Sequence, residues 1–179
     1  GPGAKGTFDS HWGAAHGGRG GSNPAAPYGC SNAPALPGSG GAGGGYGGGV
    51  VAVRARKAIT VNGDIDAGGI YSSATIFGGA KYGSGAGGSI YLHCRTFAGT
   101  NGSVRAHGGG VVVGHTDTSG AGGGGRIAVW RRYDTATEGL VTNVTALAGT
   151  RGRGTNPAGE DGTVVWGWLP AAGTLMLMR

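Results

Sequence analysis

The chain has 179 residues, including 46 glycines and 7 prolines, a share that is typical of low-complexity or disordered segments. Only 12% of the residues are charged and 38% are hydrophobic, however, and disordered chains have the opposite balance. The glycines are clustered rather than placed at every third position, which excludes collagen, and there is no apolar run long enough for a membrane span. The net charge of +6 comes without a Lys/Arg run, so nucleic acid is a disfavoured partner.

Residues 1–37 form an N-terminal region that we expect to be a cap on the end of the fold or a loop along it. Asp9, His11 and His16 lie within it and are residue types that bind metals or orient one another. Their spacing matches no zinc signature, so we expect packing and hydrogen bonding in preference to a metal site. Gly1-Pro2 looks like the remnant of a cleaved tag, so the lack of a signal peptide leaves export open.

Residues 38–179 contain an internal repeat, which we interpret as one repeat domain. Four segments align without gaps, begin with Gly and start 39, 37 and 37 residues apart: residues 49–55, 88–94, 125–131 and 162–168. Each alternates with period two, which predicts a strand with one buried face. The predicted inward pairs are Val51/Val53, Ile90/Leu92, Ile127/Val129 and Val164/Trp166.

A second strand is predicted after each of the first three, at residues 59–67, 97–106 and 140–146, whereas the fourth repeat has only residues 175–178. Gly-rich stretches separate these pairs: residues 38–49, 78–88, 107–125 and 149–162. They are expected to be loops, an additional layer or extended segments of polyproline II type, with Gly where a corner or close approach leaves no room for Cβ.

The pattern predicts an all-β fold, a parallel β-solenoid of about four repeats, in which stacking builds the core that one repeat cannot form alone. The alternative is an antiparallel β-sandwich made of hairpins. In that case Asn62-Gly63 and Asn101-Gly102 would be the hairpin turns.

Several Gly-rich motifs follow one another along the chain. They include His16-Gly-Gly-Arg-Gly-Gly21, Gly87-Gly-Ser-Ile-Tyr-Leu92 and Gly122-Gly-Gly-Gly-Arg-Ile-Ala-Val129. The series resembles Gly-rich β-helix-like segments of large bacterial secreted or surface proteins and of some plant glycine-rich wall-associated proteins. The resemblance implies an extracellular or cell-surface module of a longer polypeptide, and it brings no catalytic mechanism.

Two columns of outward side chains follow if the repeats stack in register. Position six of the motif gives Arg54, His93 and Trp130, and the position two residues on gives Arg56, Arg95 and Arg132. Guanidinium groups on successive rungs repel one another unless anions compensate. The hypothesis is therefore an anion-binding strip for uronate or sulfate groups, with the indole as a stacking surface for sugars. The alternative is that these residues only keep the face soluble.

The remaining features leave alternatives open. His115 and Asp117, near His107, could serve as an acid–base pair, but they also suit a loop tip, which we favour. The apolar end, with Val164–Leu169 and the Leu-Met-Leu-Met at 175–178, is either a terminal cap or a contact for a neighbouring domain or subunit. Cys30 and Cys94 allow one disulfide or none.

The function that we favour is a non-catalytic structural or adhesion module that recognises an acidic polysaccharide along the arginines, without a cofactor. A polysaccharide lyase or glycoside hydrolase and a self-assembling structural repeat are the alternatives.

Overall fold

The computed structural model describes residues 1–3, 12–42, 44–71, 83–111, 119–150 and 158–171. The described chain is almost entirely strand and extended segment, with one short helix. The elements in chain order are β1 (Val50–Thr60), β2 (Asp64–Asp66), β3 (Ser89–Gly99), β4 (Ser103–Arg105), β5 (Arg126–Arg131), β6 (Tyr133–Ala136), α1 (Glu138–Thr142), β7 (Val144–Thr145) and β8 (Thr163–Trp168). Within this described part, no helix is long and apolar enough to cross a membrane.

Two parallel sheets make up the fold. The larger sheet has the order β1-β3-β5-β8, with β6 also pairing with β3, and the smaller has the order β2-β4-β7. Every pairing among the described strands is parallel, so the prediction of an antiparallel sandwich is wrong. Asn62-Gly63 is not a hairpin turn either, because it connects β1 to β2, which belong to different sheets.

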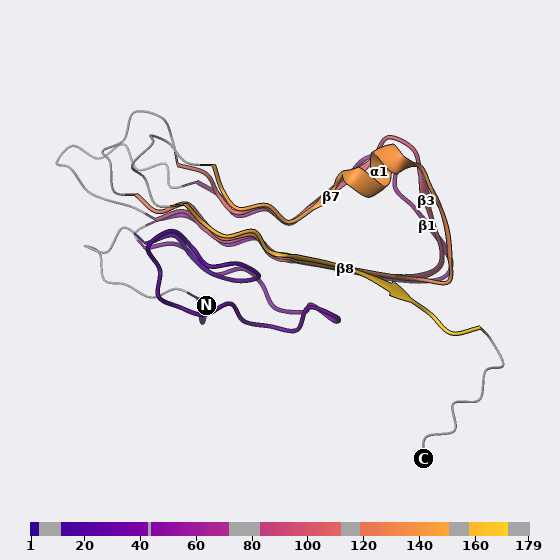
Figure 1. Ribbon diagram of the computed structural model, residues 1–179, viewed down its shortest axis with the longest axis horizontal. Coiled ribbons are helices and arrows are strands. Elements are labelled where there is room, and N and C mark those ends of the chain that lie inside the picture. The colour runs from indigo at the N-terminus through magenta and orange to yellow at the C-terminus, as the bar shows by residue number, and fades with distance from the viewer. Residues whose placement is uncertain (4–11, 43, 72–82, 112–118, 151–157, 172–179) are drawn as a thin grey trace, which may run out of the picture.

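The register of the larger sheet confirms the predicted columns. Val51 is the partner of Ile90, which pairs with Ile127, which pairs with Val164. Val53, Leu92, Val129 and Trp166 are related in the same way, so the first strands of the four repeats lie in one register over these residues. Figure 1 shows this superposition as near-coincident ribbons.

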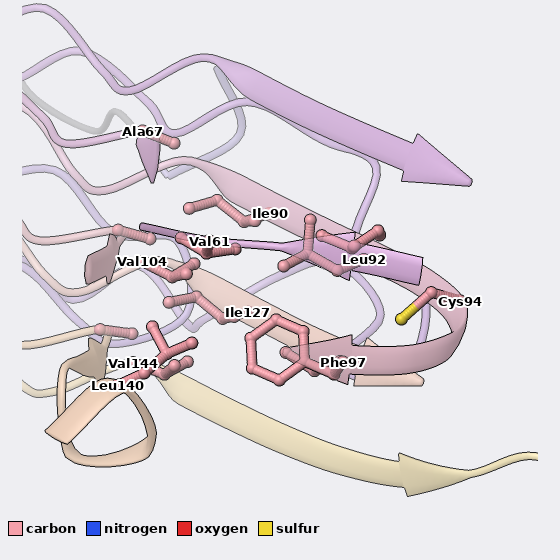
Figure 2. Packing of buried hydrophobic residues seen from close by; sticks show 14 residues of the cluster. Val61, Ala67, Ile90, Leu92, Cys94, Phe97, Val104, Ile127, Leu140 and Val144 are labelled. Atoms are coloured by element: carbon pink, nitrogen blue, oxygen red, sulfur yellow. The ribbon is translucent and has the colours of Figure 1, made fainter. Parts of the chain in front are cut away.

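The core lies between the two sheets. In each of the first three repeats the chain turns sharply within or just after its strand of the larger sheet and returns along the smaller sheet, whereas β8 runs straight on (Figure 1). Ile90 and Leu92 meet Phe97 and Val104 across this gap, and all four side chains are fully buried (Figure 2). Every second side chain of β3 and β5 points inward, and stacking these strands creates the core that a single repeat lacks.

The third repeat departs from the predicted pattern. Residues 140–146 were expected to form a strand, but α1 occupies 138–142 and only Val144–Thr145 is strand. This repeat carries three more residues before its second strand than the others, and a helical turn absorbs them because it rises ~1.5 Å per residue against ~3.3 Å in a strand. The helix places Leu140 in the core, where it is fully buried.

The described parts of the Gly-rich stretches form a packed bundle of extended segments. The backbone N–H groups of residues 122, 123 and 124 donate hydrogen bonds to three different segments, at Gly109 O, Ala14 O and Glu160 O in turn. Gly125 N then donates to Ala106 O, which belongs to the same segment as Gly109. A repeat of three residues without internal hydrogen bonds is the period of polyproline II, the third of the expected possibilities. The glycine bundle consists of residues 12–21, 38–42, 44–48, 67–70, 83–88, 106–110, 119–125, 146–150 and 158–162.

The described part of the N-terminal region runs along the stack. Residues 12–21 lie in the glycine bundle, where Gly17 and Gly18 donate hydrogen bonds to Gly124. The region then crosses the outer face of the larger sheet, where three of its backbone oxygens accept hydrogen bonds from side chains of the sheet. Arg126 Nε donates to Tyr28 O (2.8 Å), and Trp130 Nε1 donates to Asn32 O (2.7 Å). Ser89 Oγ donates to Leu36 O (2.6 Å).

Candidate functional site

The first outward column forms as predicted. Arg54 is the register partner of His93, and His93 is the partner of Trp130, with Gly167 next in line. Arg54 is exposed, while His93 and Trp130 are partly buried. The three side chains therefore belong to successive strands of one sheet face.

The second column, Arg56, Arg95 and Arg132, lies where the chain turns, within β1 and β3 and between β5 and β6; we call these residues the Arg column. Arg132 N donates to Arg95 O (3.0 Å), so these two rungs adjoin directly at this point. All three arginines line one surface hollow of about 190 Å³, together with His93, Leu169 and Pro170. A second hollow of about 310 Å³ is lined by Arg54, Arg56 and His93, and it shares the last two with the first hollow. Five of the six predicted ligand-binding residues therefore line these two hollows.

A bulge in β1 adds a cation that the sequence alignment did not place. The register slips between Ala55 and Ala58, so that Ala55 pairs with Cys94 and Ala58 with Thr96. Arg56 and Lys57 therefore both oppose Arg95, two residues against one. Both are exposed, and the first rung carries two cations at the turn.

Tyrosines hold several of these arginines. The Arg54 guanidinium lies 5.1 Å from the centre of the Tyr91 ring, and those of Arg95 and Arg132 lie 5.7 and 5.3 Å from that of Tyr133. Stacking of this kind stabilises a guanidinium in a fixed plane. We did not predict Tyr91 or Tyr133, although Tyr91 stands at an outward position of the repeat and Tyr133 follows Arg132 directly.

The turn is electrostatically uncompensated within the described residues. Among the described residues, the ion pairs join Arg105 to Asp64 and Asp66 in the smaller sheet, and Arg131 to Asp134. None of them involves Arg54 or the Arg column. Positive groups that share a hollow without a carboxylate favour a bound anion, because an anion removes their mutual repulsion.

Trp130 is held more tightly than a free stacking platform would be. Its indole nitrogen donates to Asn32 O (2.7 Å), and its ring lies over the backbone of Gly167. A Cβ at Gly167 would come within 2.4 Å of the ring, so Gly167 leaves room for the indole. Trp130 therefore links the N-terminal region to β5 and β8. Because its indole N–H is already bonded, a ligand could contact only the surface of its ring.

Arg131, which we did not single out, is a structural residue. It stands at an inward position beside Trp168 and is only 7% exposed. Its Nε and Nη2 both lie 2.9 Å from Asp134 Oδ2, and its guanidinium stacks on Trp166 (4.7 Å) and Trp168 (4.2 Å). The pair closes the core where the chain turns, and it explains why Arg132 and not Arg131 faces the hollow.

The apolar end packs partly on the stack. Trp166 meets Phe97 edge-on at 5.8 Å between ring centres, whereas Trp168 is 61% exposed. Residues 175–178 lie outside the described residues. Cys30 is exposed and Cys94 buried, and both are free thiols, so they are not bridged.

Only one of the three metal candidates, His16, lies in the part of the chain that the structure describes. Asp9 and His11 lie outside it, and its side chains include no group of three possible ligands. His16 is completely buried: Nδ1 donates to Gly87 O (2.7 Å), the ring lies 4.7 Å from that of Tyr28, and Nε2 has no partner. Burial lowers the pKa of His16, opposed by the bond to Gly87 and reinforced by the charge of Arg126, so the neutral ring serves packing.

The proposed acid–base residues are only partly described. His107 Nε2 is hydrogen-bonded to Thr145 Oγ1 (2.7 Å), and burial lowers the pKa of the imidazole. His115 and Asp117 lie outside the described residues. His107 is therefore part of the polar surface of the smaller sheet.

Comparison with protein families, with characterised proteins and with solved structures gives no match at any of the three levels. The Gly-rich surface-protein resemblance thus stays a prediction.

Proposed function

We propose that the chain is a non-catalytic, extracellular or cell-surface module, a Gly-rich β-solenoid of four repeats that binds an acidic polysaccharide at the Arg column. The exported context rests on the resemblance of its Gly-rich motifs to bacterial and plant surface proteins. The fold class rests on two parallel sheets in common register, with each of the first three repeats passing from the larger sheet to the smaller one.

One observation carries the binding proposal: Arg56, Arg95 and Arg132 line a single hollow, and no described carboxylate pairs with them. A solubilising face would be served equally well by scattered lysines, whereas the planar fork of Arg matches carboxylate and sulfate oxygens in bidentate geometry. Tyr133 stacks on Arg95 and Arg132, and this contact lowers the entropy cost of holding these two guanidinium groups in place.

The test is binding of the whole chain to immobilised polygalacturonate and heparin, with neutral dextran as the control surface. We expect retention of the wild type on the acidic surfaces at low salt and loss on raising the salt concentration. Replacing Arg56, Arg95 and Arg132 together with Ser should weaken binding at least about a hundredfold, because three charge-assisted contacts are lost.

Two matched variants separate specific recognition from bulk charge. Arg19→Ser removes one exposed positive charge in the glycine bundle, away from the Arg column, and should leave retention unchanged. The triple Arg→Lys variant keeps the charge but loses the planar fork, and it should bind with intermediate strength. Wild-type retention by the triple Ser variant would overturn the proposal, and release of unsaturated sugars during the assay would favour the lyase alternative.

A further inference from the structure

We propose that the ligand is a linear polyuronate with one carboxylate on every sugar, and that it lies across the strands, along the axis of the stack, with one sugar per rung. This inference rests on the proposed function and specifies its ligand.

The direction follows from where the cations are. Arg56, Arg95 and Arg132 come from three successive rungs, and Leu169 of the fourth completes the same hollow. Along the strands the pattern is different: β1 has Arg54 two residues before Arg56, but the corresponding residues in the next rungs are His93 and Trp130. A row of guanidinium groups therefore exists only along the stack axis.

The spacing follows from the pairing. Neighbouring strands of a sheet lie ~4.8 Å apart, and the backbone hydrogen bond from Arg132 to Arg95 (3.0 Å) shows that the spacing persists at the turn. This is close to the advance of one sugar ring along an extended polysaccharide. A polymer with one carboxylate per sugar thus presents its charges at the interval of the rungs, whereas a glycan with charge on alternate sugars or in irregular clusters does not.

The row also has a defined length and ends. The first rung presents Arg56 and Lys57 because of the bulge in β1, the next two present one arginine each, and the fourth presents Leu169 followed by Pro170. Three rungs therefore carry charge and the fourth is apolar. Tyr133, stacked on both Arg95 and Arg132, holds the two inner guanidinium groups in place.

The experiment is a length series measured by calorimetry with oligogalacturonates of two to six sugars. We expect affinity to rise about tenfold with each sugar up to three, since each adds one charge-assisted contact, and then to level off. Arg132→Ser should bring the plateau forward to two sugars, and Arg19→Ser should leave it at three. Methyl-esterified oligomers, which lack the charge, should not bind.

The outcomes separate this inference from the proposed function. Heparin oligomers that bind as tightly as oligogalacturonates at equal charge, or affinity that keeps rising with length, would overturn the one-sugar-per-rung arrangement while acidic glycan binding stands. Equal binding of single-stranded oligonucleotides would show a general polyanion surface and overturn it likewise. Absence of binding to every acidic glycan would remove both.

Discussion

Glycine acts in this molecule through close approach of backbones more than through unusual dihedral angles. The described glycines with positive φ are only Gly29 and Gly99. In the centre of the glycine bundle, by contrast, a Cβ on Gly124 would lie 2.0 Å from Ala146 O, and one on Gly122 would lie 1.9 Å from Gly85 O. Neighbouring segments touch backbone to backbone, so there is no side chain that can yield.

Gly124→Ala tests this at one residue. The methyl group pushes the backbone at Ala146 and at Gly162 away from residue 124. We therefore expect the free energy of unfolding, measured by urea titration, to fall by at least about 2 kcal/mol. Gly63→Ala is the control, because a Cβ there meets nothing within 4 Å, and its effect should stay within about 0.5 kcal/mol. Equal effects of the two substitutions would contradict the packed bundle.

His16 predicts a dependence of stability on pH. Because its pKa is lowered in the folded protein, the unfolded chain takes up the proton first, and stability present above the ordinary pKa of histidine is lost as the pH falls through and below it. His16→Asn keeps a donor near the Nδ1 position but cannot ionise, so its unfolding free energy should fall less between pH 7 and pH 5. Identical pH profiles for the two proteins would refute this role; His107→Asn isolates the other imidazole whose pKa is lowered.

At the scale of strands, the position of a rung in the stack determines what an inward residue contributes. Val129 and Val53 occupy the same column, but Val129 is fully buried between neighbours, whereas Val53 belongs to the edge strand β1 and is 37% exposed. The same residue type therefore buries different areas of apolar surface.

Val129→Ala should lower the free energy of unfolding by about 2 kcal/mol, through lost burial and the cavity left behind. Val53→Ala should cost less than about half of that, because part of its side chain is already in water. Denaturant titration of both variants measures the difference. A larger loss for Val53 would mean that β1 is covered and that the order of the sheet is wrong.

The sequence alone was sufficient for the strands whose side chains alternate. The inward pairs from Val51/Val53 to Val164/Trp166, and the column of Arg54, His93 and Trp130, appear in the sheet as predicted because period two and a common register leave one solution. The bulge that adds Lys57 and the helix at 138–142 could not be predicted, since both absorb small differences in length between repeats. Tyr133 and Arg131 were missed because their partners are brought together only by the turn.

The glycine stretches were the least predictable part. Their composition is compatible with loops, and only the hydrogen bonds between distant segments, such as Gly17 with Gly124, define the bundle. No local pattern indicates which extended segment will be the neighbour of which. The same holds for the N-terminal region, whose contacts through Tyr28 and Asn32 join residues 98 positions apart.

Across the whole molecule, one arrangement produces the core, the bundle and the site. Repeats stacked in register bury alternate side chains between two sheets, bring glycine segments into contact at one end and align arginines at the other. The glycine bundle and the N-terminal region brace the stack, and the turn at the opposite end carries the uncompensated positive charge. The ligand proposals depend on this register.

The register is tested most directly by a cross-link between Ala55 and Cys94, which are partners in β1 and β3. In a Cys30→Ser background, Ala55→Cys should form a disulfide with Cys94 under mild oxidation, because the Cα atoms of paired strands lie ~4.8 Å apart, within the range that disulfides span. Ala58→Cys, whose partner is Thr96, should not. Peptide mapping by mass spectrometry that finds the 55–94 bridge supports stacked repeats, and a bridge from position 58 but not from 55 would contradict them.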